Sequence, residues 1–217
     1  MKNALAVALL AAVVSMPMAA HAAPMQVKLI SGGGTIGGGE FGFAIKPGDD
    51  LVDFLSFCME RGEQISVGST YFVESATSAR FGGVGGAVNG EDPLDPRTAY
   101  LYSAFVNGTL AGYDGSVTAQ DALQLAIWRI EEEIDAAYDG LGNAAARALA
   151  DAFYQAAINA GWQDIGNVRV ARLWLNYDAA TGYSGVAQDV LRVPEPGSPL
   201  LVGVGLLGLA TRSRRRR

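Results

Sequence analysis

The chain of 217 residues has little of two residue types on which many active sites depend, since it contains one cysteine and one histidine. Sites that pair serine or cysteine with histidine need an imidazole, and zinc sites built from Cys and His need three or four such ligands. His21 falls in a segment that we expect to be removed, so the working protein would hold no imidazole. The lone Cys58 cannot form an internal disulfide. These absences exclude both classes of site and predict no metal and no cofactor.

Residues 1–22 have the pattern of a secretory signal peptide. Lys2 precedes an apolar run over residues 4–16, and small residues end the segment. This order is typical of Sec export signals, with cleavage expected here between Ala22 and Ala23. The alternative is a membrane anchor, which would need about 20 apolar residues and a stop-transfer flank. We therefore favour export.

Residues 194–217 combine three features of a sorting tail. Pro194, Glu195 and Pro196 are followed by an apolar stretch over residues 200–210 and then by five arginines. This stretch is long enough for only about half of a bilayer core, which suits transient retention with the arginines in the cytoplasm. The segment resembles the PEP-CTERM sorting signal of Gram-negative bacteria that make exopolysaccharide.

The resemblance to PEP-CTERM tails implies a route for the protein. An exosortase-type protease would remove the tail after transient association with the inner membrane. The product would then lie at the cell surface or in the extracellular matrix. A plain transmembrane anchor preceded by prolines is the alternative reading of the same residues.

Removal of both ends leaves an acidic protein. Residues 23–193 carry 10 basic and 21 acidic side chains, a net charge of −11 where the whole chain has −6. A surface of this sign repels nucleic acid phosphates, so we expect no nucleic acid partner.

The region from residue 23 to 193 is predicted to form one α+β domain. Helices are expected at residues 99–106, from Thr118 as the capping residue onward, and at 144–160 with Gly161 as the stop. The order of strands, helices and strands predicts a mainly β scaffold, sandwich- or barrel-like, with an inserted helical subdomain. Runs of strand character cover residues 26–30, 41–45, 53–60, 64–67, 71–73, 168–175 and 186–191.

Two further patterns carry weaker signals. Residues 37–42 match the dinucleotide fingerprint G-x-G-x-x-G, but strand-like alternation follows the third glycine where a helix is required, so a glycine-rich hairpin is favoured. The acidic residues 91–95 offer oxygen ligands for calcium as part of a non-covalent binding module, but they lack the regular spacing of a calcium hand, which favours a solvated turn.

Two short segments hold the remaining chemistry. Cys58 stands between Phe57 and Met59 in a strand-like run, where an inert buried thiol is the ordinary interpretation. Gln124 lies near the start of the strongest helix, one position from its core stripe, and is expected at the margin of the apolar face. A glutamine with ordinary hydrogen bonds is the ordinary interpretation there.

Together the two segments resemble the Cys–Gln thioester domains of bacterial surface proteins, of the TQXA-like type. That family pairs an aromatic-Cys-hydrophobic motif with a hydrophobic-Gln-x-x-hydrophobic-Trp motif, although many members have Thr where this chain has Leu123. The resemblance implies an internal thioester between Cys58 and Gln124 in a helical subdomain that carries the glutamine. Residues that support the two motifs are Phe57, Met59, Glu60, Ile127 and Trp128.

A thioester predicts a covalent binder that acts once, not a turnover enzyme. The thiol of Cys58 would displace ammonia from Gln124, and an amine or hydroxyl of a surface or matrix target would later displace the thiol. The base is open between carboxylates such as Glu60 and a tyrosine. One alternative is a buried structural cross-link, which closes a loop worth roughly 4 kcal/mol. Another is a non-covalent module that binds exopolysaccharide or matrix, and a carboxylate-based hydrolase is the least favoured.

Overall fold

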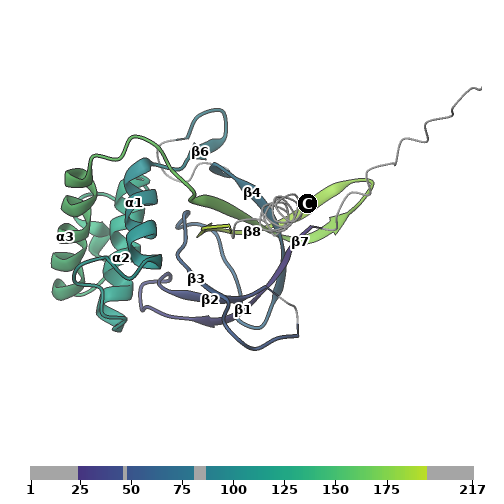
Figure 1. Cartoon of the computed structure of the whole chain (residues 1–217), viewed down its shortest axis with the longest axis horizontal. Coiled ribbons are helices and arrows are strands. Elements are labelled where there is room, and N and C mark those ends of the chain that lie inside the picture. Colours follow the sequence, from purple (N-terminus) through teal and green to yellow (C-terminus); the bar gives the residue numbers. More distant parts are fainter. Residues whose placement is uncertain (1–23, 46–47, 81–86, 195–217) are drawn as a thin grey trace, which may run out of the picture.

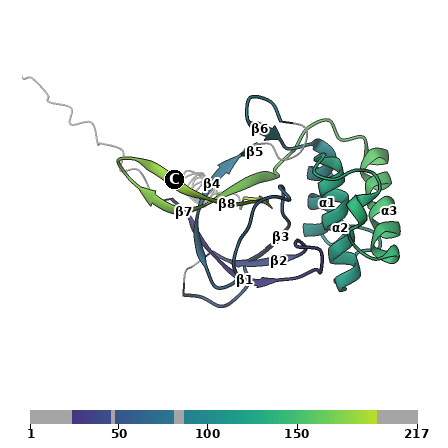
Figure 2. The same ribbon diagram turned by 180° about the vertical axis from the view of Figure 1, so that it is seen from behind.

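The structure is a computed structural model, and it describes residues 24–45, 48–80 and 87–194. Three α-helices lie side by side at one end of the molecule, and a long hairpin of β7 and β8 extends in the opposite direction (Figure 1, and from behind in Figure 2). Along the chain, strands β1–β6 precede the helices and strands β7–β8 follow them. The expected α+β class, with helices inserted between two groups of strands, is confirmed.

One antiparallel sheet contains six strands in the order β3-β2-β1-β4-β7-β8, and β5 and β6 form a second, two-stranded sheet. Burial alternates along β1, as the sequence pattern predicts for a strand with one face on the core. The strands are β1 (Gln26–Gly32), β2 (Phe41–Ala44), β3 (Phe54–Ser56), β4 (Thr70–Ala76), β5 (Ser78–Arg80), β6 (Glu91–Pro93), β7 (Arg169–Asp178) and β8 (Gly182–Arg192).

The two edge strands of the large sheet approach each other beside Cys58. Cys58 forms an isolated antiparallel bridge with Val190 of β8. On either side, the Met59 N–H donates to the Asp189 carbonyl (2.9 Å) and the Leu191 N–H donates to the Phe57 carbonyl (3.1 Å). These bonds fix the Cys58 segment against β8. No closed barrel is found among the described residues, so the sandwich or barrel detail of the prediction is not confirmed.

Each α-helix begins after a residue whose side-chain oxygen accepts a backbone N–H, namely Asp95, Ser116 and Asn143, whereas the short 3₁₀-helix η1 (Tyr138–Gly140) has no such cap. The predicted cap Thr118 is therefore wrong by two residues, because the Ser116 hydroxyl accepts the Ala119 N–H. The last helix ends at Gly161 in the left-handed region, as predicted. The helices are α1 (Pro96–Val106), α2 (Val117–Ile130) and α3 (Ala144–Ala160).

Helix α2 packs against α1 and α3 and contacts the Cys58 segment, and it is buried on all sides over residues 121–128. No side of this part of the helix faces solvent. The side chain of Gln124 is fully buried, so the expectation that Gln124 lies at the margin of an apolar face is wrong. The helical core around α2 also includes Phe57 and Met59, while a second core lines the inside of the sheet with Val27, Leu29, Phe43, Leu173 and Val190.

The strand expected at residues 64–67 does not form. Strand β1 pairs with β2 on one edge and with β4 on the other, so this segment cannot pair with β1. Its Ser66 N–H donates instead to the Tyr71 hydroxyl (2.8 Å). A run of strand-like residues becomes a strand only where a partner edge is open.

Candidate functional site

The first turns of α2 hold the glycine-rich segment that follows β1. The Gly34 N–H donates to Gln120 Oε1 (3.1 Å), and Thr35 donates its N–H and its hydroxyl to the two carboxylate oxygens of Asp121 (2.7 and 2.6 Å). Phe41 then opens strand β2 and not a helix, so the rejection of a dinucleotide fingerprint is confirmed. The segment is instead fixed against α2.

Gln124 and Cys58, 66 residues apart, lie in direct contact. The side-chain oxygen Oε1 of Gln124 accepts the Cys58 N–H (3.0 Å), and its Nε2 donates to the Cys58 carbonyl (2.9 Å). Oε1 also accepts the Gly39 N–H from the glycine-rich segment (3.2 Å). The amide is therefore held at both of its ends, and its carbonyl oxygen receives two backbone donors.

Gly38 is required at this contact for steric reasons. A Cβ at this position would lie 2.8 Å from the Trp128 ring and 3.0 Å from Cγ of Gln124. Real Cβ atoms do not approach other atoms so closely, so any side chain here would displace Gln124. The ring of Trp128 in the glutamine motif thus packs against the backbone of the glycine-rich segment.

Cys58 itself is 2 % exposed. Burial raises the pKa of its thiol well above the ordinary value, and the charge of Glu63 raises it further. The thiol is therefore neutral at pH 7 and needs a base before it can act as a nucleophile.

A surface depression of about 360 Å³ lies beside Cys58 and is lined by Gly33, Gly38, Glu63 and Gln188 among others. Burial raises the pKa of Glu63 to about 7, and the charge of Asp189 contributes in the same direction. A carboxylate with this pKa can take up and release a proton near neutral pH. Sequence reasoning missed Glu63, because no pattern relates it to the Cys motif.

The other predicted motif residues serve packing. Phe57, Met59, Ile127 and Trp128 are at most 1 % exposed and belong to the helical core. The Phe57 ring packs edge-on against Phe105, with centroids 5.1 Å apart. These side chains position the Cys and Gln segments and contribute no reactive group.

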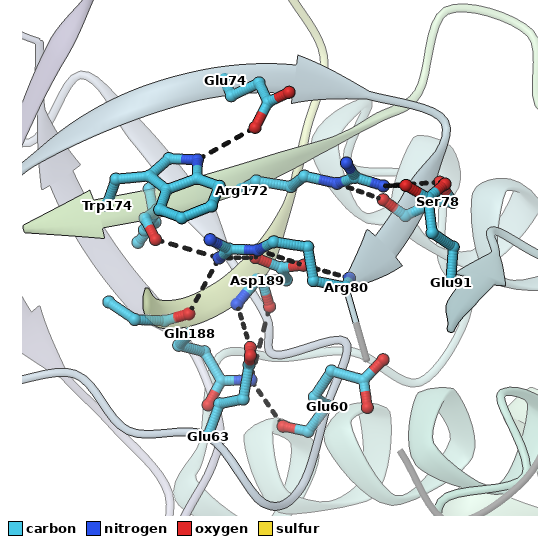
Figure 3. Close-up of polar contacts among 12 residues, drawn as sticks. Glu60, Glu63, Glu74, Ser78, Arg80, Glu91, Arg172, Trp174, Gln188 and Asp189 are labelled. Carbon is cyan, nitrogen blue, oxygen red and sulfur yellow. Dashed lines mark hydrogen bonds and ion pairs between the residues drawn. The ribbon is translucent and has the colours of Figure 1, made fainter. Parts of the chain in front are cut away.

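Glu60, the carboxylate named from the sequence as a possible base, points elsewhere. Figure 3 shows its backbone carbonyl as the acceptor for Gln188 Nε2, while its carboxylate points away from Gln188. That carboxylate lies in a group with those of Asp92 and Glu133. Glu63 and not Glu60 therefore shares the depression with Cys58.

A buried ion pair supports this region from the side of the sheet. Arg80 and Asp189 are 5 % and 0 % exposed, and the Arg80 guanidinium contacts the Asp189 carboxylate. The guanidinium also donates to two backbone carbonyls and lies over the Trp174 ring, 4.0 Å from its centroid. The Asp189 N–H donates to Glu63 Oε2 (2.8 Å), so the pair connects to the depression beside Cys58 (Figure 3).

The sorting tail begins where the described residues end. Pro194 is the last of them, and Ala22, Ala23, Glu195 and Pro196 lie outside the described residues. Within those residues no helix has the length and apolar character to cross a membrane. The predicted membrane segment at 200–210 also lies outside them.

Residues 192–216 match the family model of the PEP-CTERM protein-sorting motif. This is a PEP-CTERM sorting tail. The motif indicates an exported protein that undergoes membrane-associated sorting and exosortase processing and then lies at the surface or outside the cell. The match covers the tail alone, so it carries no information about the domain before it. No curated protein and no solved structure is significantly similar to the chain.

Proposed function

We propose that this PEP-CTERM protein of the bacterial surface or extracellular matrix captures its target covalently through a thioester between Cys58 and Gln124. The observation that carries the proposal is the contact of the two residues, in which the Gln124 amide bonds both the N–H and the carbonyl of Cys58. An unactivated amide needs a high effective concentration of the thiol to react, and these bonds support the proposal because they fix the amide on the backbone of the cysteine that carries the thiol.

Bond formation needs a base, an oxyanion site and a leaving group. Glu63 takes the proton of the Cys58 thiol, and the sulfur attacks Cδ of Gln124. The Cys58 and Gly39 N–H groups donate to the oxygen on which negative charge develops. The C–N bond then breaks, ammonia leaves with the proton from Glu63, and the S–C bond remains.

Capture reverses the roles of the two residues. An amine or hydroxyl that enters the depression attacks Cδ of Gln124, the thiol of Cys58 leaves with a proton, and an amide or ester joins the target to the chain. The Gln124 acyl group is consumed, so each molecule acts once and the protein is not a turnover enzyme.

A purely structural cross-link is the first competing role for the same bond. The burial of Cys58 and Gln124 favours it, since a nucleophile must reach an atom that is closed to solvent. Non-covalent binding to exopolysaccharide is the second. Half-buried rings on β7 and β8 favour it, because Tyr177 and Tyr183 lie there with ring centroids 5.0 Å apart and such rings can pack against sugars.

Intact mass of the exported protein tests the thioester. We expect a mass lower than that of the processed sequence by one ammonia, with no titratable thiol after denaturation. Cys58→Ala should restore the full mass for its sequence. Hydrolysis of the thioester would leave a free thiol and convert Gln124, and no other glutamine, to glutamate. This result would also support the proposal. An unmodified Gln124 with a free thiol in fresh protein would overturn it.

Methylamine separates capture from a structural cross-link. If the bond is accessible, the wild-type protein gains one methylamine at Gln124 and one free thiol, whereas Gln124→Ala gains neither. A protein that lacks one ammonia but resists methylamine while folded would have a structural cross-link.

Absence of residues after the PEP motif in the released form would agree with exosortase processing.

A further inference from the structure

Three carboxylates from distant parts of the chain meet below the Cys58 segment. Glu60 follows Cys58 by two residues, Asp92 lies in β6, and Glu133 lies in the turn after α2. Each offers one carboxylate oxygen, and these oxygens all lie within 4.8 Å of one another. The three residues are only 3 %, 4 % and 1 % exposed. The prediction of a solvated turn at residues 91–95 is therefore wrong for Asp92.

Two of these carboxylates each have one buried oxygen without a partner in the part of the chain that the structure describes. Oε1 of Glu60 and Oδ2 of Asp92 are buried without a hydrogen-bond partner among the described residues. Glu133 accepts the Arg61 N–H through Oε2 (3.0 Å). Buried polar atoms are nearly always bonded, so two unpartnered oxygens in one small group indicate a missing ligand.

The electrostatic surroundings agree with a missing cation. Burial, together with the charge of Glu133, raises the pKa of Glu60 to about 9 and that of Asp92 to about 6. Burial raises the pKa of a fourth carboxylate, Glu131, to about 8, and the charge of Asp92 contributes in the same direction. Like charges at such distances repel strongly at low dielectric, and a bound cation removes the repulsion.

We propose that Glu60, Asp92 and Glu133 bind one calcium ion. The ligand atoms are all oxygens, which hard cations prefer. Calcium–oxygen distances of 2.3–2.6 Å allow two ligands of one ion to stand up to roughly 5 Å apart, and the three oxygens meet this limit. Exported modules bind calcium at about 10⁻⁴–10⁻³ M, and we expect an affinity in this range.

Two surface depressions reach the proposed ligands, and a bound ion would connect three parts of the chain. A depression of about 210 Å³ is lined by Asp92 and Glu131, and another of about 480 Å³ is lined by Glu133. A bound ion would join the Cys58 segment, the β5–β6 hairpin and the end of α2. The proposal does not depend on the thioester, because none of its ligands is Cys58 or Gln124.

Calcium binding can be measured directly on the full chain after removal of metal with a chelator. Equilibrium dialysis should find one calcium ion per chain, and added calcium should raise the melting temperature. The proposal predicts the same result for Cys58→Ala, so failure of the thioester and failure of the calcium site are distinguishable. No bound calcium at millimolar concentration would overturn the proposal.

Isosteric variants locate the site. Glu60→Gln, Asp92→Asn and Glu133→Gln should each weaken calcium binding at least tenfold while the far-ultraviolet circular dichroism spectrum in chelator stays unchanged. The matched control is Glu132→Gln, since Glu132 lies in the same turn with its side chain exposed. Should one variant fail to fold, the other two still decide the question. Binding retained in the folded variants, or lost equally in Glu132→Gln, would overturn the assignment.

Discussion

Two polar sites lie two residues apart on the same segment and differ in how their buried groups are satisfied. At Cys58 the neutral amide of Gln124 has protein partners for both its oxygen and its nitrogen. At Glu60 the carboxylates repel one another, and two oxygens have no partner among the described residues. The fold completes the first site by itself, while the second is complete only with a ligand from outside. This difference separates a preorganised reaction site from a binding site.

The largest expected effect is on the first site, through Cys58→Ala. Loss of the cross-link should lower the free energy of unfolding by about 4 kcal/mol, and the small cavity should add about 1 kcal/mol. Urea denaturation of exported protein measures the change. A loss of only about 1 kcal/mol would mean that the wild-type protein has no cross-link.

Substitution of a buried charge by a neutral amide should change the free energy of unfolding in opposite directions, depending on whether the charge has a partner. Asp189→Asn leaves the Arg80 guanidinium buried without its counter-ion and should lower the free energy of unfolding by about 3–5 kcal/mol. Glu60→Gln removes a repelled acid and should raise it when calcium is absent. Urea titrations in chelator test both variants, and an equal loss in both would contradict the distinction.

The pH dependence sharpens the same comparison. In chelator, Glu60 with a pKa of about 9 binds more protons in the folded than in the unfolded state above pH 5. Stability should therefore fall as pH rises from about 5 to 9, by at most about 1.4 kcal/mol per pH unit for each proton. Saturating calcium should make this slope shallower. A slope that calcium does not change would contradict an ion at Glu60.

The smallest expected effect comes from Gly38→Ala. The added methyl would meet the Trp128 ring and Gln124, so we expect the free energy of unfolding to fall by roughly 1 kcal/mol and the thioester to form more slowly. Intact mass over time measures the rate of thioester formation. Gly62→Ala is the matched control, since a Cβ there meets nothing and its backbone is not left-handed. Equal effects of the two substitutions would mean that Gly38 has no role at the site.

Much of the fold could be predicted because it depends on local patterns. Helix α3 occupies the predicted residues 144–160, since a capping Asn143 and a stop at Gly161 are properties of short segments. The predicted strand at 64–67 failed because pairing depends on edges that β2 and β4 occupy. The sequence also singled out Cys58 and Gln124, and the structure places the Gln124 amide against the backbone of Cys58, while a thioester between them stays a prediction.

Other parts of the site had no signal in the sequence. Glu63 reaches the depression beside Cys58 because of how the chain turns after Cys58, and no spacing rule predicts that turn. Asp92 follows Glu60 by 32 residues, and Glu133 follows Asp92 by 41. Their grouping is therefore visible only after folding. The buried position of Gln124 likewise follows from what covers α2 on every side.

The sequence by itself determined the sorting tail and the extent of helix α3, because each depends on residues close together in the chain or on a short motif. Only the tertiary structure decided which carboxylate lies beside the thiol and which three gather away from water. Desolvation and repulsion act between groups that folding brings within a few ångströms. They set the pKa of Glu63 and leave two buried oxygens in need of a ligand.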